Sequence, residues 1–139
     1  MLAGVLCASA QTTTESNQPD ETKYLSTSDF KSKVYNYKES PKEWKYKGER
    51  PCIIDFYATW CGPCKRLAPV LKAVASDHKG KIDVYKVDVD KEPELANVFG
   101  IRSVPSLLFV PAEGLPQMAQ GALPREYIDQ IIAQVLNTK

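Results

Sequence analysis

The fold of this chain is decided around Trp60-Cys61-Gly62-Pro63-Cys64-Lys65, a hexapeptide whose two cysteines are separated by two residues. An apolar run, Cys52-Ile53-Ile54-Asp55-Phe56-Tyr57, precedes it, and a stretch with apolar residues at helical spacing, Gly62 to Ser76, begins within it. The sequence therefore predicts a strand, a sharp turn and a helix, with Cys61 at the N-terminus of the helix.

This placement predicts redox chemistry for the two cysteines. The unpaired N–H groups and the positive dipole end of a helix favour a thiolate over a thiol, so we expect Cys61 to be a nucleophile. The spacing lets Cys61 and Cys64 join as a short-loop disulfide or separate as a dithiol with little backbone movement. Pro63 fits the first helical turn, and Gly62 allows another chain to approach Cys61 closely.

A structural zinc site and a static disulfide are the alternatives for this pair. Zinc needs four ligands, and after residue 10 only Cys52 and His78 remain as further cysteine or histidine ligands. A static bridge across two residues would close a very small loop and contribute little stability. Both alternatives are therefore disfavoured, and no metal site is expected.

The order of motifs along the chain resembles the thioredoxin family. Besides the hexapeptide, the resemblance rests on Asp55 in the preceding strand, Pro69 inside the helix, Lys86 in the next strand, Val104-Pro105-Ser106 before a further strand, and Gly121-Ala122 near the end. It extends roughly from Lys23 to Leu136. It implies a thioredoxin fold, in which a central mixed sheet of about five strands is flanked by about four helices.

The pattern of the whole chain agrees with an α/β class. The expected strands are Tyr24-Leu25, 52–57, Ile82 to Val89, and a hairpin of Ser106 to Val110 with Gln117 to Gly121. The expected helices start at Asp29 with Ser28 as cap, at Gly62, at Asp90 with Gly100 as C-cap, and at Pro124. The resulting order, β-α-β-α-β-α-β-β-α, is typical of α/β proteins.

A buried acid is expected behind the cysteines. A carboxylate in the middle of an apolar strand is costly to bury, which favours a functional reading of Asp55. The resemblance implies that Asp55 accepts the proton of Cys64, the second and more enclosed cysteine, and that Lys86 is the partner of Asp55. Without the resemblance, Lys86 would be weak evidence for such a role, because a lysine in a strand most often faces solvent.

The resemblance also implies a surface that binds substrate. Pro105 would be a cis proline facing the sulfur atoms, which leaves the Val104 backbone free to pair with an extended substrate main chain. The surrounding apolar contact surface would comprise Trp60, Gly62, Pro63, Val104, Gly121 and Ala122. The alternative for Trp60 is a core aromatic residue.

Some positions depart from the family pattern. Tyr57 stands where thioredoxins commonly have Trp, and a polar insertion extends from Lys38 to Arg50. Its Trp44 and Tyr46 either pin the insertion to the domain, which we favour, or form a patch for a partner. Cys52 is expected to be a buried free thiol, and His78 a residue at the helix end.

Length and charge limit the other possibilities. The chain has 139 residues, 43% hydrophobic and 25% charged, which predicts a single globular domain. Lysine and arginine total 18 against 17 for aspartate and glutamate, giving a net charge of +1. Such a balance provides no field to gather nucleic acid or an acidic membrane, and a monomer is expected.

The N-terminal residues predict export. Residues 1–10 are apolar or small, and Ala8-Ser9-Ala10 fits the cleavage pattern of a secretory signal, so we interpret them as the remnant of one. We therefore expect a periplasmic or otherwise exported protein. Lipid attachment at Cys7 is an alternative that the large Leu6 disfavours. Residues 11–22 predict a flexible leader, and residues 23–139 a thioredoxin domain.

The expected function is that of a protein-disulfide reductase, an enzyme that acts through a mixed disulfide on Cys61 and needs no cofactor beyond the Cys61–Cys64 pair. The Gly-Pro dipeptide is associated with reducing members of the family, although an exported context also permits an oxidant or isomerase. A non-catalytic docking subunit is a third reading. Partners would be disulfide-bearing proteins and a separate electron-donating reductase, membrane-bound or soluble, because no GxGxxG follows a strand.

Overall fold

The computed structural model describes residues 19–136 and contains one five-stranded sheet with the order β1-β3-β2-β4-β5. The expected signal remnant, Cys7 and residues 11–18 of the expected leader lie outside the described residues. The elements are β1 (Lys23–Tyr24), α1 (Thr27–Lys33), β2 (Cys52–Tyr57), α2 (Gly62–Asp77), β3 (Asp83–Asp88), α3 (Pro93–Val98), β4 (Ser106–Val110), β5 (Gln117–Gln120), α4 (Arg125–Ile131) and a π-helical turn, η2 (Ile132–Leu136).

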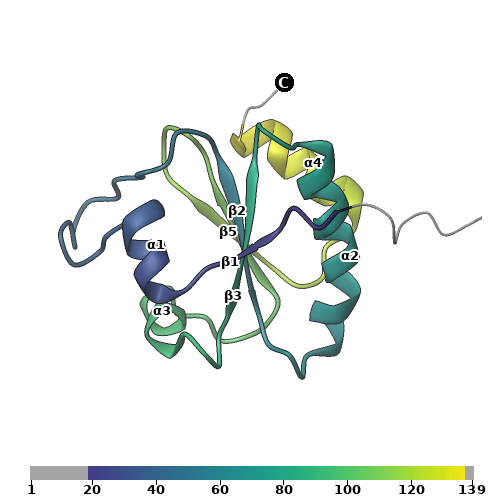
Figure 1. Cartoon of the computed structure of the whole chain (residues 1–139), viewed down its shortest axis with the longest axis horizontal. Helices are drawn as coiled ribbons and strands as arrows, with labels where there is room; N and C mark the ends of the chain where they lie inside the picture. Colours follow the sequence, from purple (N-terminus) through teal and green to yellow (C-terminus); the bar gives the residue numbers. More distant parts are fainter. Residues whose placement is uncertain (1–18, 137–139) are drawn as a thin grey trace, which may run out of the picture.

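The sheet is mixed and is covered on both faces. Strand β2 pairs in parallel with β3 and antiparallel with β4, while β1 pairs in parallel with β3. Helices α1 and α3 lie on one face, and α2 and α4 on the other (Figure 1). This confirms the predicted α/β class, the order of elements and the thioredoxin fold.

The side chains on the two faces of β2 pack into different core clusters. Successive strand residues point to opposite faces, so Ile53 joins the core cluster of α2 and α4 whereas Ile54 joins that of α1 and α3. Asp55, two residues after Ile53, shares the face toward α2. The pleat of the strand thus directs the carboxylate to α2, the helix that carries Cys64 and that Cys61 caps.

Two helix starts differ from the prediction by two residues or more. Helix α1 is capped by Ser26, whose Oγ accepts the N–H of Asp29 at 3.0 Å, so the helix starts two residues before the expected Asp29. Helix α3 begins at Pro93 instead of Asp90, because residues 88–92 form a turn in which Glu92 N donates to Asp88 O at 2.9 Å. A proline fits the first helical position, since it has no N–H to leave unpaired.

The insertion is held against the domain. The Trp44 ring lies 4.6 Å from that of Tyr35, centroid to centroid, and both Trp44 and Tyr46 pack against the core cluster of α1. The N–H of Lys47 donates to the carbonyl of Val34 at 2.8 Å. The predicted pinning is confirmed.

Cys52 and His78 also lie where they were expected. Cys52 is a buried free thiol at the start of β2, and His78 caps the C-terminus of α2. None of the helices in residues 19–136 combines the length and the apolar character needed to cross a membrane.

Candidate active site

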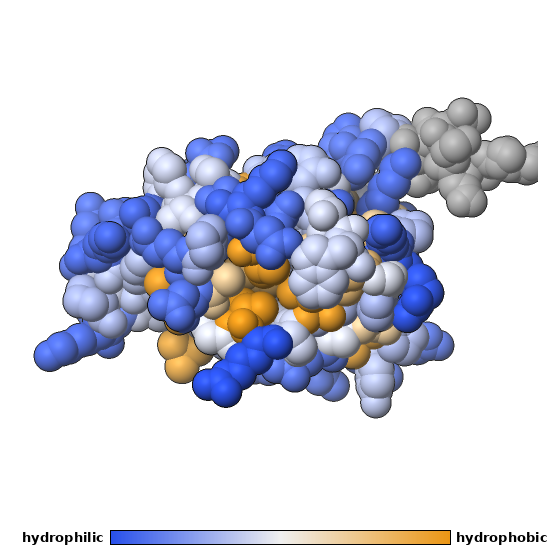
Figure 2. All heavy atoms as spheres, turned by 90° about the horizontal axis from the view of Figure 1, so that it is seen from below, coloured by the Kyte–Doolittle hydropathy of each residue, from blue (hydrophilic) through white to orange (hydrophobic). Residues whose placement is uncertain are grey.

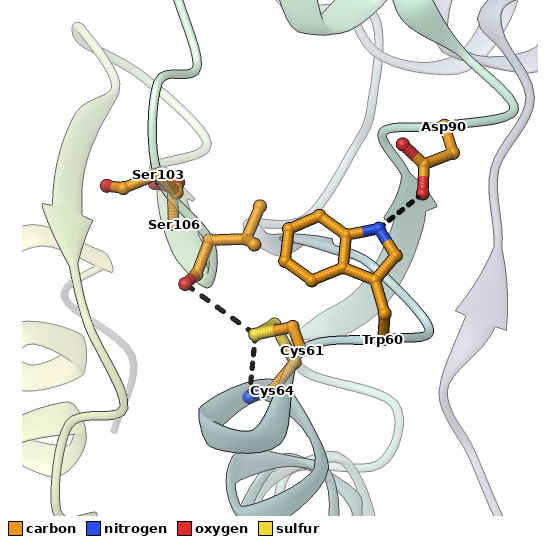
Figure 3. The surroundings of a disulfide bond; sticks show 7 residues. Trp60, Cys61, Cys64, Asp90, Ser103 and Ser106 are labelled. Carbon is orange, nitrogen blue, oxygen red and sulfur yellow. Dashed lines mark hydrogen bonds between the residues drawn. A yellow bond between two sulfur atoms is a disulfide. The ribbon is translucent and has the colours of Figure 1, made fainter.

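The turn between β2 and α2 places Cys61 at the N-cap of a 16-residue helix. Cys61 has an extended backbone, with φ of −90° and ψ of 115°, and Pro63 occupies the first turn. The N–H of Cys64 donates to Cys61 Sγ at 3.1 Å, and Cys61 and Cys64 are joined by a disulfide with their Cα atoms 5.3 Å apart (Figure 3). The helix start predicted from the hexapeptide is confirmed.

The loop before β4 faces the same sulfur. The peptide bond between Val104 and Pro105 is cis, and the carbonyl oxygen of Val104 lies 3.6 Å from Cys61 Sγ (Figure 3). Ser106 Oγ donates to the carbonyl of Ser103 at 2.8 Å, and Gly121 N donates to that of Pro105 at 2.8 Å. These bonds tie the loop to β4 and to the turn after β5, and the predicted cis proline beside the sulfur atoms is confirmed.

Both cysteines are 4% exposed, so the expected difference in enclosure is absent from this disulfide form. They differ in what they face. Cys61 is directed toward the Val104 carbonyl, whereas Cys64 lines a cavity of about 200 Å³ shared with Asp55 and Lys86. Direction, and not exposure, distinguishes the two sulfur atoms.

Asp55 is the buried acid of the site. Asp55 is 1% exposed, and its Oδ1 has no hydrogen-bond partner within residues 19–136. Burial raises the pKa of Asp55 to about 7, and the positive charge of Lys86, its neighbour across the β2–β3 pair, opposes that rise. A carboxyl with such a pKa exchanges its proton readily near neutral pH.

Trp60 is exposed and anchored at its indole nitrogen. The side chain is 70% exposed, which excludes the core alternative, and its Nε1 donates to Asp90 Oδ2 at 2.8 Å (Figure 3). Asp90 was missed as a site residue. Because β2 and β3 are parallel neighbours, the residues after their carboxyl ends meet at one edge of the sheet, and this is the signal that could have found Asp90.

The remaining contact residues surround the disulfide to different degrees. Gly62, Pro63 and Ala122 are exposed, Val104 and Gly121 are half-buried, and Pro105 is buried. Figure 2 shows apolar side chains gathered at the centre of this end of the molecule, with hydrophilic ones around them. Among the described residues, no group of three or more histidine, cysteine or acidic side chains is arranged to hold a metal ion.

A disulfide across two residues at a helix N-terminus, faced by a cis-proline loop and backed by a buried acid, is the arrangement of a thiol–disulfide oxidoreductase of α/β fold. The family model described as thioredoxin matches residues 21–134, and the chain belongs to the thioredoxin family. Proteins of this family are protein-disulfide oxidoreductases that use a redox-active disulfide, without a cofactor, to reduce disulfide-bearing proteins, and a reductase reduces them in turn.

Individual relatives agree with this assignment. The chain is 44% identical over 108 residues to a thioredoxin of Borreliella burgdorferi, covering 78% of this chain and 92% of that protein. It is 40% identical over 86 residues to thioredoxin 1 of Nostoc sp., covering 62% and 80%. The crystal structure of chloroplastic thioredoxin z superposes with a TM-score of 0.71 at 27% identity, covering 88% of this chain and all of that one.

Proposed function

We propose that this protein reduces disulfide bonds of partner proteins outside the cytoplasm, with Cys61 as the attacking residue and Cys64 as the resolving residue. The observation that carries the proposal is the Cys61–Cys64 disulfide at the start of α2, with Cys61 Sγ facing the Val104 carbonyl. In the reduced form, the Cys64 N–H and the helix dipole would stabilise a Cys61 thiolate.

The reaction is an exchange of sulfur–sulfur bonds. The Cys61 thiolate attacks one sulfur of a substrate disulfide, so that a Cys61–substrate bond forms, the substrate S–S bond breaks, and the departing substrate thiolate takes a proton from water. Cys64 then loses its proton and attacks Cys61 Sγ. The Cys61–Cys64 bond forms, the second substrate thiolate leaves, and two electrons have passed from the dithiol to the substrate.

Asp55 is proposed as the group that takes the Cys64 proton. Both residues line the 200 Å³ cavity, and the raised pKa of about 7 lets the carboxylate hold that proton. Lys86 lines the same cavity and moderates the pKa of Asp55 by its charge. The proton can then return to solvent before the next cycle.

Substrate would bind across the cis-proline loop. The Val104 backbone lies beside Cys61, and an extended substrate main chain could pair with it without regard to sequence. Trp60, Gly62, Pro63, Gly121 and Ala122 would supply the apolar contacts around that strand. The anchoring of the Trp60 indole by Asp90 keeps the ring beside the disulfide.

Export and the electron donor complete the proposal. The apolar residues 1–10 support secretion to the periplasm or another exported location. A separate reductase, either membrane-bound or soluble, would restore the dithiol. Because Cys61, Cys64 and Asp55 all lie on one chain, the monomer is proposed as the working unit.

Insulin reduction driven by dithiothreitol tests this function. The protein should accelerate precipitation of the insulin B chain, and Cys61→Ser should abolish that acceleration. Cys64→Ser should accumulate a mixed disulfide with substrate, visible by mass spectrometry. Full acceleration by the Cys61→Ser variant would overturn the assignment of the nucleophile.

A further inference from the structure

The ammonium group of Lys86 lies within about 6 Å of two neighbouring tyrosine rings. Lys86 Nζ is 4.9 Å from the ring centroid of Tyr57 and 5.4 Å from that of Tyr24, and the two rings are 6.4 Å apart. A lysine ammonium within about 6 Å of an aromatic ring is attracted by the negative face of that ring. The two rings therefore restrain where the Lys86 charge resides.

The sheet register brings this cluster to the buried acid. Tyr24 of β1 is aligned with Lys86 of β3, which is aligned with Asp55 of β2. Residues opposite one another on adjacent strands lie on the same face, and Tyr57 is two residues beyond Asp55 on that face. Tyr24, Lys86 and Asp55 thus form one row across three strands.

The restraint on Lys86 Nζ matters because two carboxyl groups, those of Asp55 and Asp20, line a cavity with Lys86. A second cavity, of about 250 Å³, is lined by Asp55, Lys86, Lys72 and also Asp20 from the segment before β1. The charge of Lys86 acts on both acids. Against the effect of burial, hydrogen bonds from Thr22 and then the charge of Lys86 lower the pKa of Asp20, and the same charge opposes the rise that burial causes in the pKa of Asp55. If the Lys86 side chain were free to turn outward, its ammonium group could pair with the exposed Asp20 instead of the buried Asp55.

Apart from Lys86, the Tyr24 side chain interacts with Tyr57, through a ring contact and a side-chain hydrogen bond. Tyr24 is 73% exposed, it stands in a strand of two residues at the sheet edge, and it is absent from the core clusters of the described chain. Tyr57 alone would contact Lys86 from the β2 side only. The Tyr24 ring, from β1, adds a second contact to Lys86 Nζ beside that of Tyr57.

We propose that Tyr24 is a positioning residue for disulfide reduction: its ring, together with that of Tyr57, holds the Lys86 ammonium beside Asp55. The proposal rests on the proposed role of Asp55 as the proton acceptor for Cys64. Holding the positive charge there favours the carboxylate form of Asp55, the form able to accept a proton. Loss of the Tyr24 ring should therefore make Asp55 a weaker acid.

The test compares Tyr24→Leu, which removes the ring, with Tyr24→Phe, which keeps the ring and removes the hydroxyl. The carboxyl of Asp55 is titrated by carbon NMR in the full-length oxidised protein. The other charged groups near the acid, Asp20, Lys65, Lys72 and Asp88, remain in every variant. Tyr24→Leu should raise the pKa of Asp55 by roughly half a pH unit, whereas Tyr24→Phe should leave it close to the wild-type value.

The rate of insulin reduction provides a second readout. Below neutral pH, Tyr24→Leu should reduce the rate about two- to threefold, and the rates of the two proteins should converge at higher pH, where Asp55 is ionised in both. A wild-type Asp55 titration in Tyr24→Leu would overturn the proposal. An equal shift in Tyr24→Phe would also overturn it, because the hydroxyl and not the ring would then be responsible.

A double-mutant cycle separates the effect of the contact between Tyr24 and Lys86 from a general disturbance of β1. In a Lys86→Gln background, where the ammonium is gone, Tyr24→Leu should cause no further shift of the Asp55 pKa. A shift as large as in the wild-type background would contradict the proposal. The role of Asp55 as proton acceptor is tested separately with Asp55→Asn. Full activity of that variant would disprove this role, and the NMR titration would still show whether Tyr24 affects the pKa of Asp55.

Discussion

Asp55 combines burial, a missing hydrogen-bond partner and a nearby lysine, and this combination sets its chemistry. Because Asp55 is 1% exposed, its carboxylate form loses most of its hydration, and the positive charge of Lys86 compensates for only part of that loss. The folded protein therefore binds a proton more tightly at Asp55 than the unfolded chain does. An acid suited to accept a proton near neutral pH is for that reason also a source of instability.

This imbalance predicts a pH-dependent gain in stability for Asp55→Asn. Between the model-compound pKa of 3.8 and the folded pKa of about 7, the native state binds more protons than the unfolded state, so the stability contributed by Asp55 falls as pH rises through this range. Removing the charge should raise the free energy of unfolding by roughly 2–4 kcal/mol at pH 8, and by much less at pH 4. Urea unfolding of both proteins across this range measures it.

A pH-independent difference between Asp55→Asn and wild type would contradict the account. It would mean that the change in packing, and not the ionisation of Asp55, governs the difference. The matched control is Asp29→Asn, at a half-buried acid in the first turn of α1, which should show no comparable gain at pH 8.

The anchor of Trp60 gives a second prediction at this scale. Asp90→Ala removes the acceptor of the indole N–H, so the ring should become more mobile, and KM for a protein disulfide should rise about two- to threefold with kcat little changed. Steady-state insulin reduction measures this. Unchanged KM, or a loss confined to kcat, would show that the Trp60–Asp90 bond does not serve substrate binding.

At the scale of elements, the insertion between α1 and β2 is a structural appendage. Trp44→Ala should lower the free energy of unfolding by about 2 kcal/mol, because the half-buried ring packs on Tyr35, and should leave the rate of insulin reduction unchanged. Chemical denaturation and the insulin assay check the two parts. The control Lys42→Ala alters an exposed residue of the same insertion.

The opposite pattern would change the interpretation of the insertion. If Trp44→Ala preserved stability while it weakened activity toward a protein substrate, the insertion would be a partner-contacting patch. The packing of Trp44 and Tyr46 on the core cluster of α1 is the reason to expect the first pattern.

Element types were predicted from sequence more securely than element starts. The apolar run of β2 and the helical spacing after Gly62 depend on many residues together, and the structure confirms the strand and the helix that they predict. The start of α1 was predicted from Ser28 as the cap, whereas Ser26 caps the helix; the two serines are equally good caps by residue type. The start of α3 depended on a turn over residues 88–92 that propensity alone does not reveal.

At the scale of the whole molecule, the site joins segments that lie far apart in sequence. Cys61, Cys64 and Asp55 were predicted from local sequence as well as from the resemblance, whereas Lys86 and Pro105 were predicted from the resemblance to a known family. Asp90 and Tyr24 were not, since their relevance depends on which strands are neighbours in the sheet. The order β1-β3-β2 alone places Tyr24 in one row with Lys86 and Asp55.

The most direct test of the central claim is the equilibrium reduction potential of the Cys61–Cys64 pair, titrated in the full chain with Cys7→Ala and Cys52→Ala to isolate the couple. A reductant should give a value near the roughly −270 mV of thioredoxin. A value above about −180 mV, in the range of isomerases and oxidants, would contradict the account and indicate a protein that introduces or rearranges disulfides.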